Sequence, residues 1–264
     1  MSTSRHNLCR PARSQRGFTL VELMVTVAIA LFLLGGLVTI VQNVRTANLN
    51  QTALAQLADE QRFALTVITD AIQAGGYFAD PTTQTTATLG VQANPAPTAA
   101  YQAGWVFAGS HTVGALDSVA TDSIATRFQT ALGYGPILCD GTDTSKLAAN
   151  NYSIQFFIQV TAGVGSQLMC SVNGGAPVAL VTGVKAMAVY YGVKRDQTVA
   201  DYNVDTYVTW DMMSTLNGAN DYDNVSAVRI VLTFDNPLFG QANQPQTITV
   251  ERVIEVMGRA GLHT

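Results

Sequence analysis

One carboxylate lies inside an otherwise uncharged apolar stretch near the start of the chain. The stretch runs from Phe18 to Val41, covers 24 residues, and has Glu22 as its one charged residue. About 20 apolar residues are enough for a helix to cross the bilayer core. An isolated carboxylate in hydrocarbon costs roughly 2.5–3.5 kcal/mol even on the gentler insertion scales. Glu22 therefore needs a cationic partner, unless it lies at the depth of the lipid headgroups.

The segment before this stretch carries four arginines and no acidic residue: Arg5, Arg10, Arg13 and Arg16. Positive charge beside a membrane span predicts a cytoplasmic N-terminus and an exported remainder. A secretory signal shares the basic start, but its apolar core has about 7–15 residues and a small-residue cleavage site follows it. Here the apolar run is longer and continues as Gln42-Asn43-Val44-Arg45. These differences argue against an ordinary secretory signal.

Two of the three cysteines, Cys139 and Cys170, fall in the part of the chain that we expect to be exported, whereas Cys9 precedes the apolar run. An even pair in an oxidising compartment predicts a disulfide, with two buried free thiols as the alternative. Closing a loop of this size stabilises the fold by roughly 3–4 kcal/mol on the loop-entropy model. The cysteines form no CxxC pair and no histidine accompanies them, which argues against a zinc site.

No familiar catalytic motif occurs in the chain, and its three histidines, His6, His111 and His263, form no constellation with other reactive residues. We therefore expect no catalytic activity, no cofactor and no metal site. One stretch is nevertheless rich in oxygen ligands: Asn217, Asn220, Asp221, Asp223 and Asn224. Calcium binding there stays open, although such side chains also form turns without metal.

Charge and aromatic residues set further bounds on function. The formal net charge at pH 7 is −4, and without the four leader arginines the chain keeps 10 basic and 18 acidic residues, a net charge of −8. No basic run follows the leader, so nucleic acid is not expected as a partner. Six aromatic residues lie close together in the sequence: Tyr190, Tyr191, Tyr202, Tyr207, Trp210 and Tyr222. They suit the core of a β-sheet, and a binding patch is the alternative.

The elements that position these residues begin with one long helix. No proline or glycine interrupts Gln42 to Ala74, so we expect the apolar helix to continue to residue 75, where Gly75-Gly76 ends it. Residues at helical spacing form a stripe that should face the rest of the protein: Leu54, Leu57, Ala58, Leu65, Ile68 and Ile72. Phe63 and Val67 fall on nearly the opposite side. Either a loop of the same chain covers them or a neighbouring subunit does.

The remainder of the chain predicts antiparallel β-structure. Short β-like runs alternate with turn signals at 105–108, 118–128, 152–160, 167–172, 178–181, 184–193, 225–234 and 247–257. Asn173-Gly174-Gly175 predicts a hairpin turn between the fourth and fifth runs. In the run Val225–Phe234, alternate residues from Val228 to Phe234 should face the core. The fold class is therefore α+β, a long N-terminal helix packed on an antiparallel sheet domain.

Gly17 to Met24 reads Gly-Phe-Thr-Leu-Val-Glu-Leu-Met, and this segment resembles the type III signal and N-terminal helix of type IV pilins and type II secretion pseudopilins. The resemblance implies that a prepilin peptidase cuts after Gly17 and methylates Phe18 as the first mature residue. It also implies that Glu22 pairs with the N-terminal amine of a neighbouring subunit. The apolar run is then retained, because the cut precedes it.

Six further segments resemble, in order, the minor pilin family PilW: Arg62–Leu65, Ala74–Phe78, Asp122–Ile124, Leu168–Cys170, Val189–Val193 and Val225–Ile230. This resemblance implies a minor pilin that primes type IV pilus assembly, at or near the filament tip, in a fimbrium that supports twitching motility. Its implied partners are other minor pilins, the major pilin, the prepilin peptidase and possible tip adhesins. The pseudopilin GspJ of type II secretion is similar in architecture and is one alternative; a membrane-anchored ligand- or adhesin-binding module is another.

Together these expectations divide the chain into four parts. Residues 1–17 are the leader peptide, 18–41 the membrane-spanning or filament-core half of the helix, 42–75 its amphipathic half, and 76–264 a β-rich periplasmic domain. The resemblance implies a single-pass protein of the inner membrane, with its N-terminus in the cytoplasm, that later joins the pilus at the cell surface. Phe63 and Val67 are candidate subunit contacts.

Overall fold

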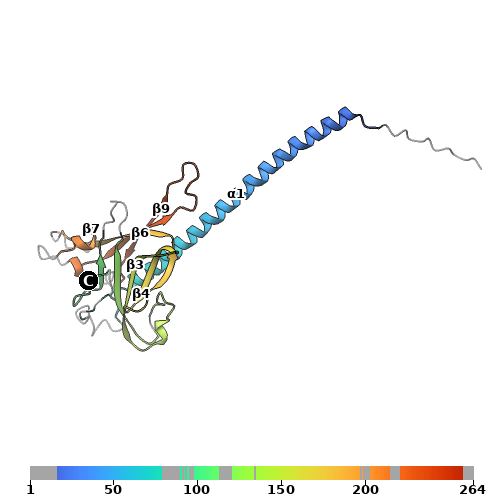
Figure 1. Cartoon of the computed structure of the whole chain (residues 1–264). Helices are drawn as coiled ribbons and strands as arrows, with labels where there is room; N and C mark the ends of the chain where they lie inside the picture. The colour runs from blue at the N-terminus through green and yellow to red at the C-terminus, as the bar shows by residue number, and fades with distance from the viewer. Residues whose placement is uncertain are drawn as a thin grey trace, which may run out of the picture. The chain divides into compact units, whose positions relative to one another are not determined.

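The computed structural model describes residues 17–78, 98–112, 121–133, 135–196, 203–214 and 221–257, together with residues 90, 92, 94 and 198. One long helix, α1 (Leu20–Gln73), precedes two antiparallel sheets, so the predicted α+β fold is confirmed (Figure 1). Contacts divide the chain into two compact units, Met1–Thr52 and Ala53–Thr264, and the division falls within α1.

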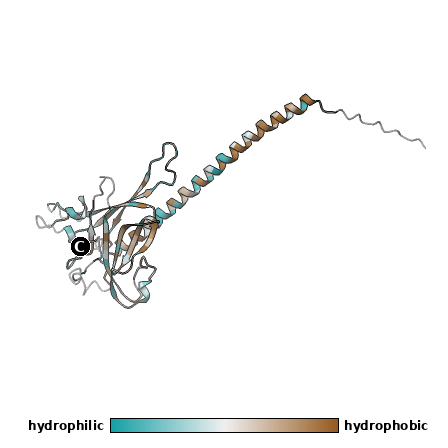
Figure 2. Cartoon of the chain, viewed as in Figure 1, coloured by the Kyte–Doolittle hydropathy of each residue, from teal (hydrophilic) through white to brown (hydrophobic). Residues whose placement is uncertain are grey.

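The first unit carries the apolar start of α1. All side chains from residue 17 to residue 49 are exposed. Within the part of the chain that the structure describes, α1 is the one helix long and apolar enough to cross a membrane. The hydrophobic colouring is concentrated at its beginning (Figure 2). An apolar helix without internal cover is a surface that lipid or another protein must bury.

In the second unit, the last turns of α1 pack against the sheets through these buried residues: Leu57, Ala64, Leu65, Ile68, Ala71 and Ile72. The predicted stripe is correct at four positions and wrong at Leu54 and Ala58, which are exposed. Ala64 and Ala71 are buried instead. Small alanine side chains let a helix approach its neighbour closely, so they face the β-structure although periodicity alone gave them no priority.

Two glycines end the helix for different reasons. A Cβ atom on Gly75 would lie 2.6 Å from the Oγ1 atom of Thr126, so the close approach of β-structure requires glycine there. Gly76 has a φ of +73°, the left-handed conformation that glycine adopts without strain. Beyond it, the Gly76 N–H donates to the carbonyl of Arg127, and the chain enters the β-structure. The predicted helix stop at this glycine pair is confirmed.

The first sheet has five strands in sequential order, β1-β2-β3-β4-β5, and every neighbouring pair is antiparallel. Its strands are β1 (Phe107–Ser110), β2 (Ser123–Thr130), β3 (Asn150–Thr161), β4 (Gly165–Val172) and β5 (Val178–Thr182). The predicted hairpin between β4 and β5 is confirmed. Asn173 and Gly174 have φ values of 49° and 71°, and the Gly175 N–H donates to the Val172 carbonyl, so a tight turn with two left-handed residues lies within the connection.

The second sheet has the order β7-β6-β8-β9, again with antiparallel neighbours. Its strands are β6 (Val184–Val193), β7 (Thr206–Val208), β8 (Ala227–Asp235) and β9 (Thr247–Glu255). On β8 the predicted core residues Val228, Ile230, Leu232 and Phe234 are all fully buried. One hydrophobic core joins these side chains to the first sheet and to the buried face of α1.

Candidate functional site

The start of α1 is fixed by a threonine cap beside the predicted cleavage position. Residues 17–19 are not helical, and α1 begins at Leu20. The Oγ1 atom of Thr19 accepts a hydrogen bond from the Glu22 N–H at 3.2 Å, and the Thr19 carbonyl accepts from the Leu23 N–H at 3.2 Å. The cap is absent from the features predicted above, although its Thr-x-x-Glu spacing is the sequence signal of a capping box.

Glu22 therefore lies in the first turn of the helix, where the helix dipole favours negative charge. Its side chain is exposed, as is that of Phe18, which is 80% exposed. Gly17 and Phe18 lie just before the start of α1, and Glu22 lies in its first turn. This arrangement presents a carboxylate and an apolar ring to whatever surrounds the helix.

A second surface lies beside the last turns of α1, where a groove of about 290 Å³ opens between the helix and a loop that follows β2. Its lining residues are Phe63, Val67, Asp70 and Ala71 from α1, Pro136, Ile137, Leu138, Cys139 and Gly141 from the loop, and Ile154 and Phe156 from β3. Val67 is partly buried and packs against the core. Phe63 keeps 50% of its surface exposed. Val67 is thus partly covered by its own chain, whereas half of the Phe63 surface is exposed, and a subunit contact at these two residues remains a prediction.

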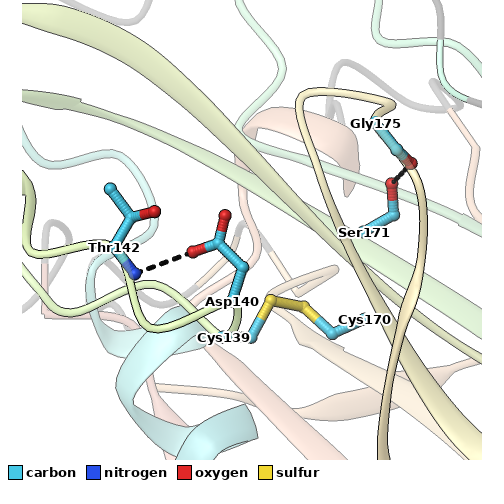
Figure 3. The surroundings of a disulfide bond; sticks show 6 residues. All are labelled: Cys139, Asp140, Thr142, Cys170, Ser171 and Gly175. Atoms are coloured by element: carbon cyan, nitrogen blue, oxygen red, sulfur yellow. Dashed lines mark hydrogen bonds between the residues drawn. A yellow bond between two sulfur atoms is a disulfide. The ribbon is translucent and has the colours of Figure 1, made fainter.

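The predicted disulfide between Cys139 and Cys170 is confirmed, with Cα atoms 6.3 Å apart (Figure 3). Cys170 lies on β4 and is almost fully buried, while Cys139 lies on the groove loop. Beside Cys139, an Asp140 carboxylate oxygen accepts from the Thr142 N–H at 2.9 Å. The cross-link holds the loop against the first sheet, so it also holds one wall of the groove in place.

The oxygen-rich stretch is only partly described, since Asn217 and Asn220 lie outside the described residues. Asp221 is buried, and its Oδ2 atom lies 2.6 Å from a guanidinium nitrogen of Arg195 and 2.9 Å from the Ser214 N–H. The hydrogen bond from Arg195 to Asp221 raises the pKa of the Arg195 guanidinium. Among the described residues no group of three or more His, Cys, Asp or Glu side chains is arranged to hold a metal. The Asp221 carboxylate acts as a structural ion-pair partner.

Several of the aromatic residues form a packing cluster between separate segments. Tyr191 is fully buried, and its ring lies 5.4 Å from that of Trp210 in an edge-on contact. Trp105 stacks on Tyr222 with ring centroids 3.9 Å apart. The expected core role therefore holds for Tyr191, while Tyr207 is 41% exposed and Tyr202 lies outside the described residues.

Comparison with known families gives two matches. A model described as Type IV Pilus-assembly protein W matches residues 155–253, from β3 to β9. A model described as Prokaryotic N-terminal methylation motif matches residues 12–38, which include Gly17, Phe18 and Glu22. No curated protein and no solved structure matched the chain.

The methylation motif and the apolar helix together associate the chain with a membrane anchor and with pili. The two matches, one at the start of the helix and one on the β-domain, support a type IV pilin-like protein of pilus assembly.

Proposed function

We propose that this protein is a minor pilin that primes assembly of a type IV pilus and lies at or near the filament tip with other minor pilins. The observation that supports this proposal best is the combination of the methylation motif with the pilus-assembly protein W region in one chain. The role is structural, without catalysis. Its partners are other minor pilins, the major pilin and the prepilin peptidase.

The proposed processing follows from the position of Gly17-Phe18. A peptidase cuts after Gly17, removes the leader 1–17 and methylates the new amine of Phe18. Residues 18–41 then form the membrane or filament-core half of the helix, 42–75 its amphipathic half and 76–264 the periplasmic domain. The protein is first held in the inner membrane with its N-terminus in the cytoplasm, and it then moves into the pilus.

Glu22 supplies the charge that sets the position of the next subunit. Its side chain is exposed in the first turn of an apolar helix, so burying that helix in a filament also buries the carboxylate. The N-terminal amine at Phe18 of an adjacent subunit is a positive group that compensates it. Removing one partner of such a buried pair costs about 3–5 kcal/mol, because the other charge is left unpaired. The pair therefore selects one register of the helices.

A comparison of Glu22→Ala with Asp59→Ala tests this role. Asp59 is an exposed acid farther along α1, in the second unit of the chain. Its replacement therefore removes a charge without changing the proposed pair. Both variants should insert into the membrane, and Glu22→Ala should be lost from purified pili while Asp59→Ala is retained. Incorporation of Glu22→Ala at the normal level would contradict the proposed pairing.

Deletion of the gene tests the broader function. A minor pilin that primes assembly should leave cells with few pili and without twitching motility, and the wild-type chain should restore both. Loss of secreted enzymes with normal piliation would instead favour a pseudopilin of the GspJ kind. Normal pili and normal secretion would favour a membrane-anchored binding module.

A further inference from the structure

One edge of the second sheet is built differently from the other sheet edges. In the part of the chain that the structure describes, the outermost strands of the two sheets are β1, β5, β7 and β9. β1 has four residues, β5 has five and β7 has three. β9 has nine residues and pairs with β8 without a register shift. It therefore forms a long and regular edge, whereas the other three edges are short.

The pairing of β9 with β8 determines which backbone groups of β9 point away from the sheet. Opposite residues of antiparallel strands alternate between pairs that exchange two hydrogen bonds and pairs that exchange none. At the two ends of the β8–β9 register, the Asn236 N–H donates to the Gln246 carbonyl and the Val256 N–H donates to the Ser226 carbonyl, both at 3.0 Å. The even-numbered residues of β9 therefore bond to β8. The residues whose N–H and carbonyl groups point to the outer edge are Thr247, Thr249, Glu251, Val253 and Glu255.

This edge lacks most of the features that prevent a further strand from pairing with a sheet. Such features include prolines, lysines and β-bulges. β9 contains no proline and no lysine, and its pairing with β8 shows no bulge. Two of its charged side chains are engaged within the chain, since Glu251 pairs with Arg229 at 2.6 Å and Arg252 donates to the Thr69 hydroxyl at 3.3 Å. Among the described residues no further strand pairs with β9, so its outer backbone groups form a template for one.

The two faces of β9 specify the side chains that a neighbouring strand needs. Directly opposite residues lie on the same face of a sheet, so the partners of the buried β8 residues face the core: Ile248, Val250, Arg252 and Ile254. Ile248 and Val250 are only partly buried against that core. The solvent face carries Glu251 and Glu255 and no basic residue. An added strand would cover Ile248 and Val250 on one face and lie beside two carboxylates on the other.

We propose that β9 receives an extended strand from a different protein chain, in which apolar side chains alternate with basic and small polar ones. Main-chain hydrogen bonds to the outer edge supply the affinity of such a contact, and the alternating side chains supply its specificity. The apolar side chains extend the core beside Ile248 and Val250, and lysine or arginine side chains face Glu251 and Glu255. The proposal rests on the sheet edge and does not depend on the priming role.

A second copy of this chain suits the edge less well. When two β9 strands pair in antiparallel fashion over all nine residues, Glu251 of each chain lies opposite Glu251 of the other. A shift of two positions in one direction places Arg252 opposite Arg252, and like charges directly opposite destabilise a strand pair. A shift in the other direction avoids both contacts, but it leaves the last two residues of each β9 without a β9 partner. A strand with basic residues uses the whole edge without this conflict.

Peptide binding to the full-length chain in detergent micelles tests the proposal. The probe is a capped, fluorescein-labelled peptide of nine residues, the length of β9, in which valine alternates with lysine or threonine. Val253→Pro removes one outward N–H at an edge position that tolerates proline, whereas Val253→Ala shortens the side chain and keeps the N–H. Fluorescence anisotropy should show that Val253→Pro binds the peptide at least about tenfold more weakly than Val253→Ala. A peptide with glutamate in place of lysine should bind the wild-type chain more weakly by a similar factor, and micelles without protein supply the background.

Amide hydrogen exchange of the wild-type chain tests the same contact without any substitution. In the chain alone, the N–H groups of Thr249, Glu251 and Val253 should exchange faster than those of Val250 and Arg252, which bond to β8. The lysine peptide should slow the exchange of the first three at least about tenfold. Residue-resolved NMR in the same micelles measures these rates.

Three results would overturn the proposal. The first is exchange at Thr249, Glu251 and Val253 that the peptide leaves unchanged. The second is equal peptide affinity of the Val253→Pro and Val253→Ala chains. The third is protection of these amides that appears without peptide and grows with protein concentration, because it would identify a second copy as the occupant. A chain that proves to have no priming role would give the same peptide binding, so the two proposals fail separately.

Discussion

The Asp122 carboxylate accepts a hydrogen bond from the backbone N–H of Val189 at 2.8 Å, so a side chain that precedes β2 in the first sheet holds the main chain of β6 in the second. Its other oxygen accepts from the Thr112 N–H at 3.2 Å and contacts the His111 ring at 2.8 Å. The Asp122 N–H also donates to the Met187 carbonyl. This buried residue joins the two sheets by polar contacts at one point.

Asp122→Ala should lower the free energy of unfolding, because it leaves the buried Val189 N–H without an acceptor. One such unsatisfied group costs roughly 1–3 kcal/mol, and the loss of the Thr112 contact adds to it. Chemical denaturation of the purified chain measures the change. Asp140→Ala is the matched control, since Asp140 is exposed and its carboxylate bonds one nearby N–H. If both variants lose the same free energy of unfolding, the hydrogen bond from Val189 to Asp122 does not contribute more to stability than an exposed one.

The pH dependence of stability should show Asp122 and Asp205 acting in opposite directions. Burial raises the pKa of Asp122 above 3.8, so over the window from 3.8 to the raised pKa the native state keeps a proton that the unfolded chain has lost. Its contribution to stability therefore falls as pH rises through that window. Hydrogen bonds from the Asp196 and Arg195 N–H groups lower the pKa of Asp205. Its contribution is present above pH 3.8 and is lost as pH falls through the lowered pKa.

Denaturant unfolding at a series of pH values checks both signs. Asp122→Asn should remove a decline in stability that begins above pH 3.8, and Asp205→Asn should remove a loss that appears below it. If the two variants change the pH profile in the same direction, the assignment of the raised pKa to Asp122 is wrong.

Removal of the disulfide should destabilise the β-domain and loosen the groove beside Phe63. The cysteines are separated by 31 positions, and opening a loop of that size costs about 3–4 kcal/mol on the loop-entropy model. The variant with both Cys139→Ala and Cys170→Ala should lose this amount in denaturant unfolding. A reductant should bring the wild-type chain to the same value and leave the variant unchanged. A wild-type chain insensitive to reductant would contradict the prediction.

Arg127 should be among the most sensitive positions in the first sheet. Its guanidinium is nearly fully buried and donates to the backbone carbonyls of Trp105, Gly90 and Gln102, the last at 2.9 Å. Arg127→Met keeps the length of the side chain but leaves these acceptors without their donors. The expected loss is at least about 3 kcal/mol, from roughly 1–3 kcal/mol for each buried unsatisfied group.

Arg229→Met is the control for that measurement. Arg229 pairs with Glu251 at 2.6 Å, but both side chains are substantially exposed. An exposed pair contributes about 0–1 kcal/mol, so this variant should unfold at nearly the same denaturant concentration as the wild-type chain. Comparable losses for the two arginine variants would mean that the carbonyl contacts of Arg127 are replaced by solvent.

Features that depend on neighbouring residues were predictable from the sequence. The bounds predicted for β6, Val184–Val193, are the observed ones, because β-branched and aromatic residues fill the strand between turn signals. The alternation on β8 and the Asn173-Gly174 turn were also correct, since each follows from local backbone chemistry. The strand β7, Thr206–Val208, was missed because three residues are too few to show a period.

Features that depend on distant partners were not predictable in the same way. Asp122 and Val189 are 67 positions apart, and nothing near either residue indicates that they meet. The exposure of Leu54 and the burial of Ala64 on α1 depend on where the sheets contact the helix, which periodicity does not specify. At the proposed assembly site, residue types and the motif led to Gly17, Phe18 and Glu22, whereas the cap at Thr19 was missed although its Thr-x-x-Glu spacing is a local signal.

The cap at Thr19 also marks the boundary between the proposed cleavage site, Gly17-Phe18, and the helix, which begins at Leu20. Peptidases act on exposed chain that is free of regular structure. Because α1 begins at Leu20, the Gly17-Phe18 bond lies in the non-helical residues just before it. The proposed cut therefore requires no local unfolding of the helix, and the new amine is released in the residues that precede the first turn.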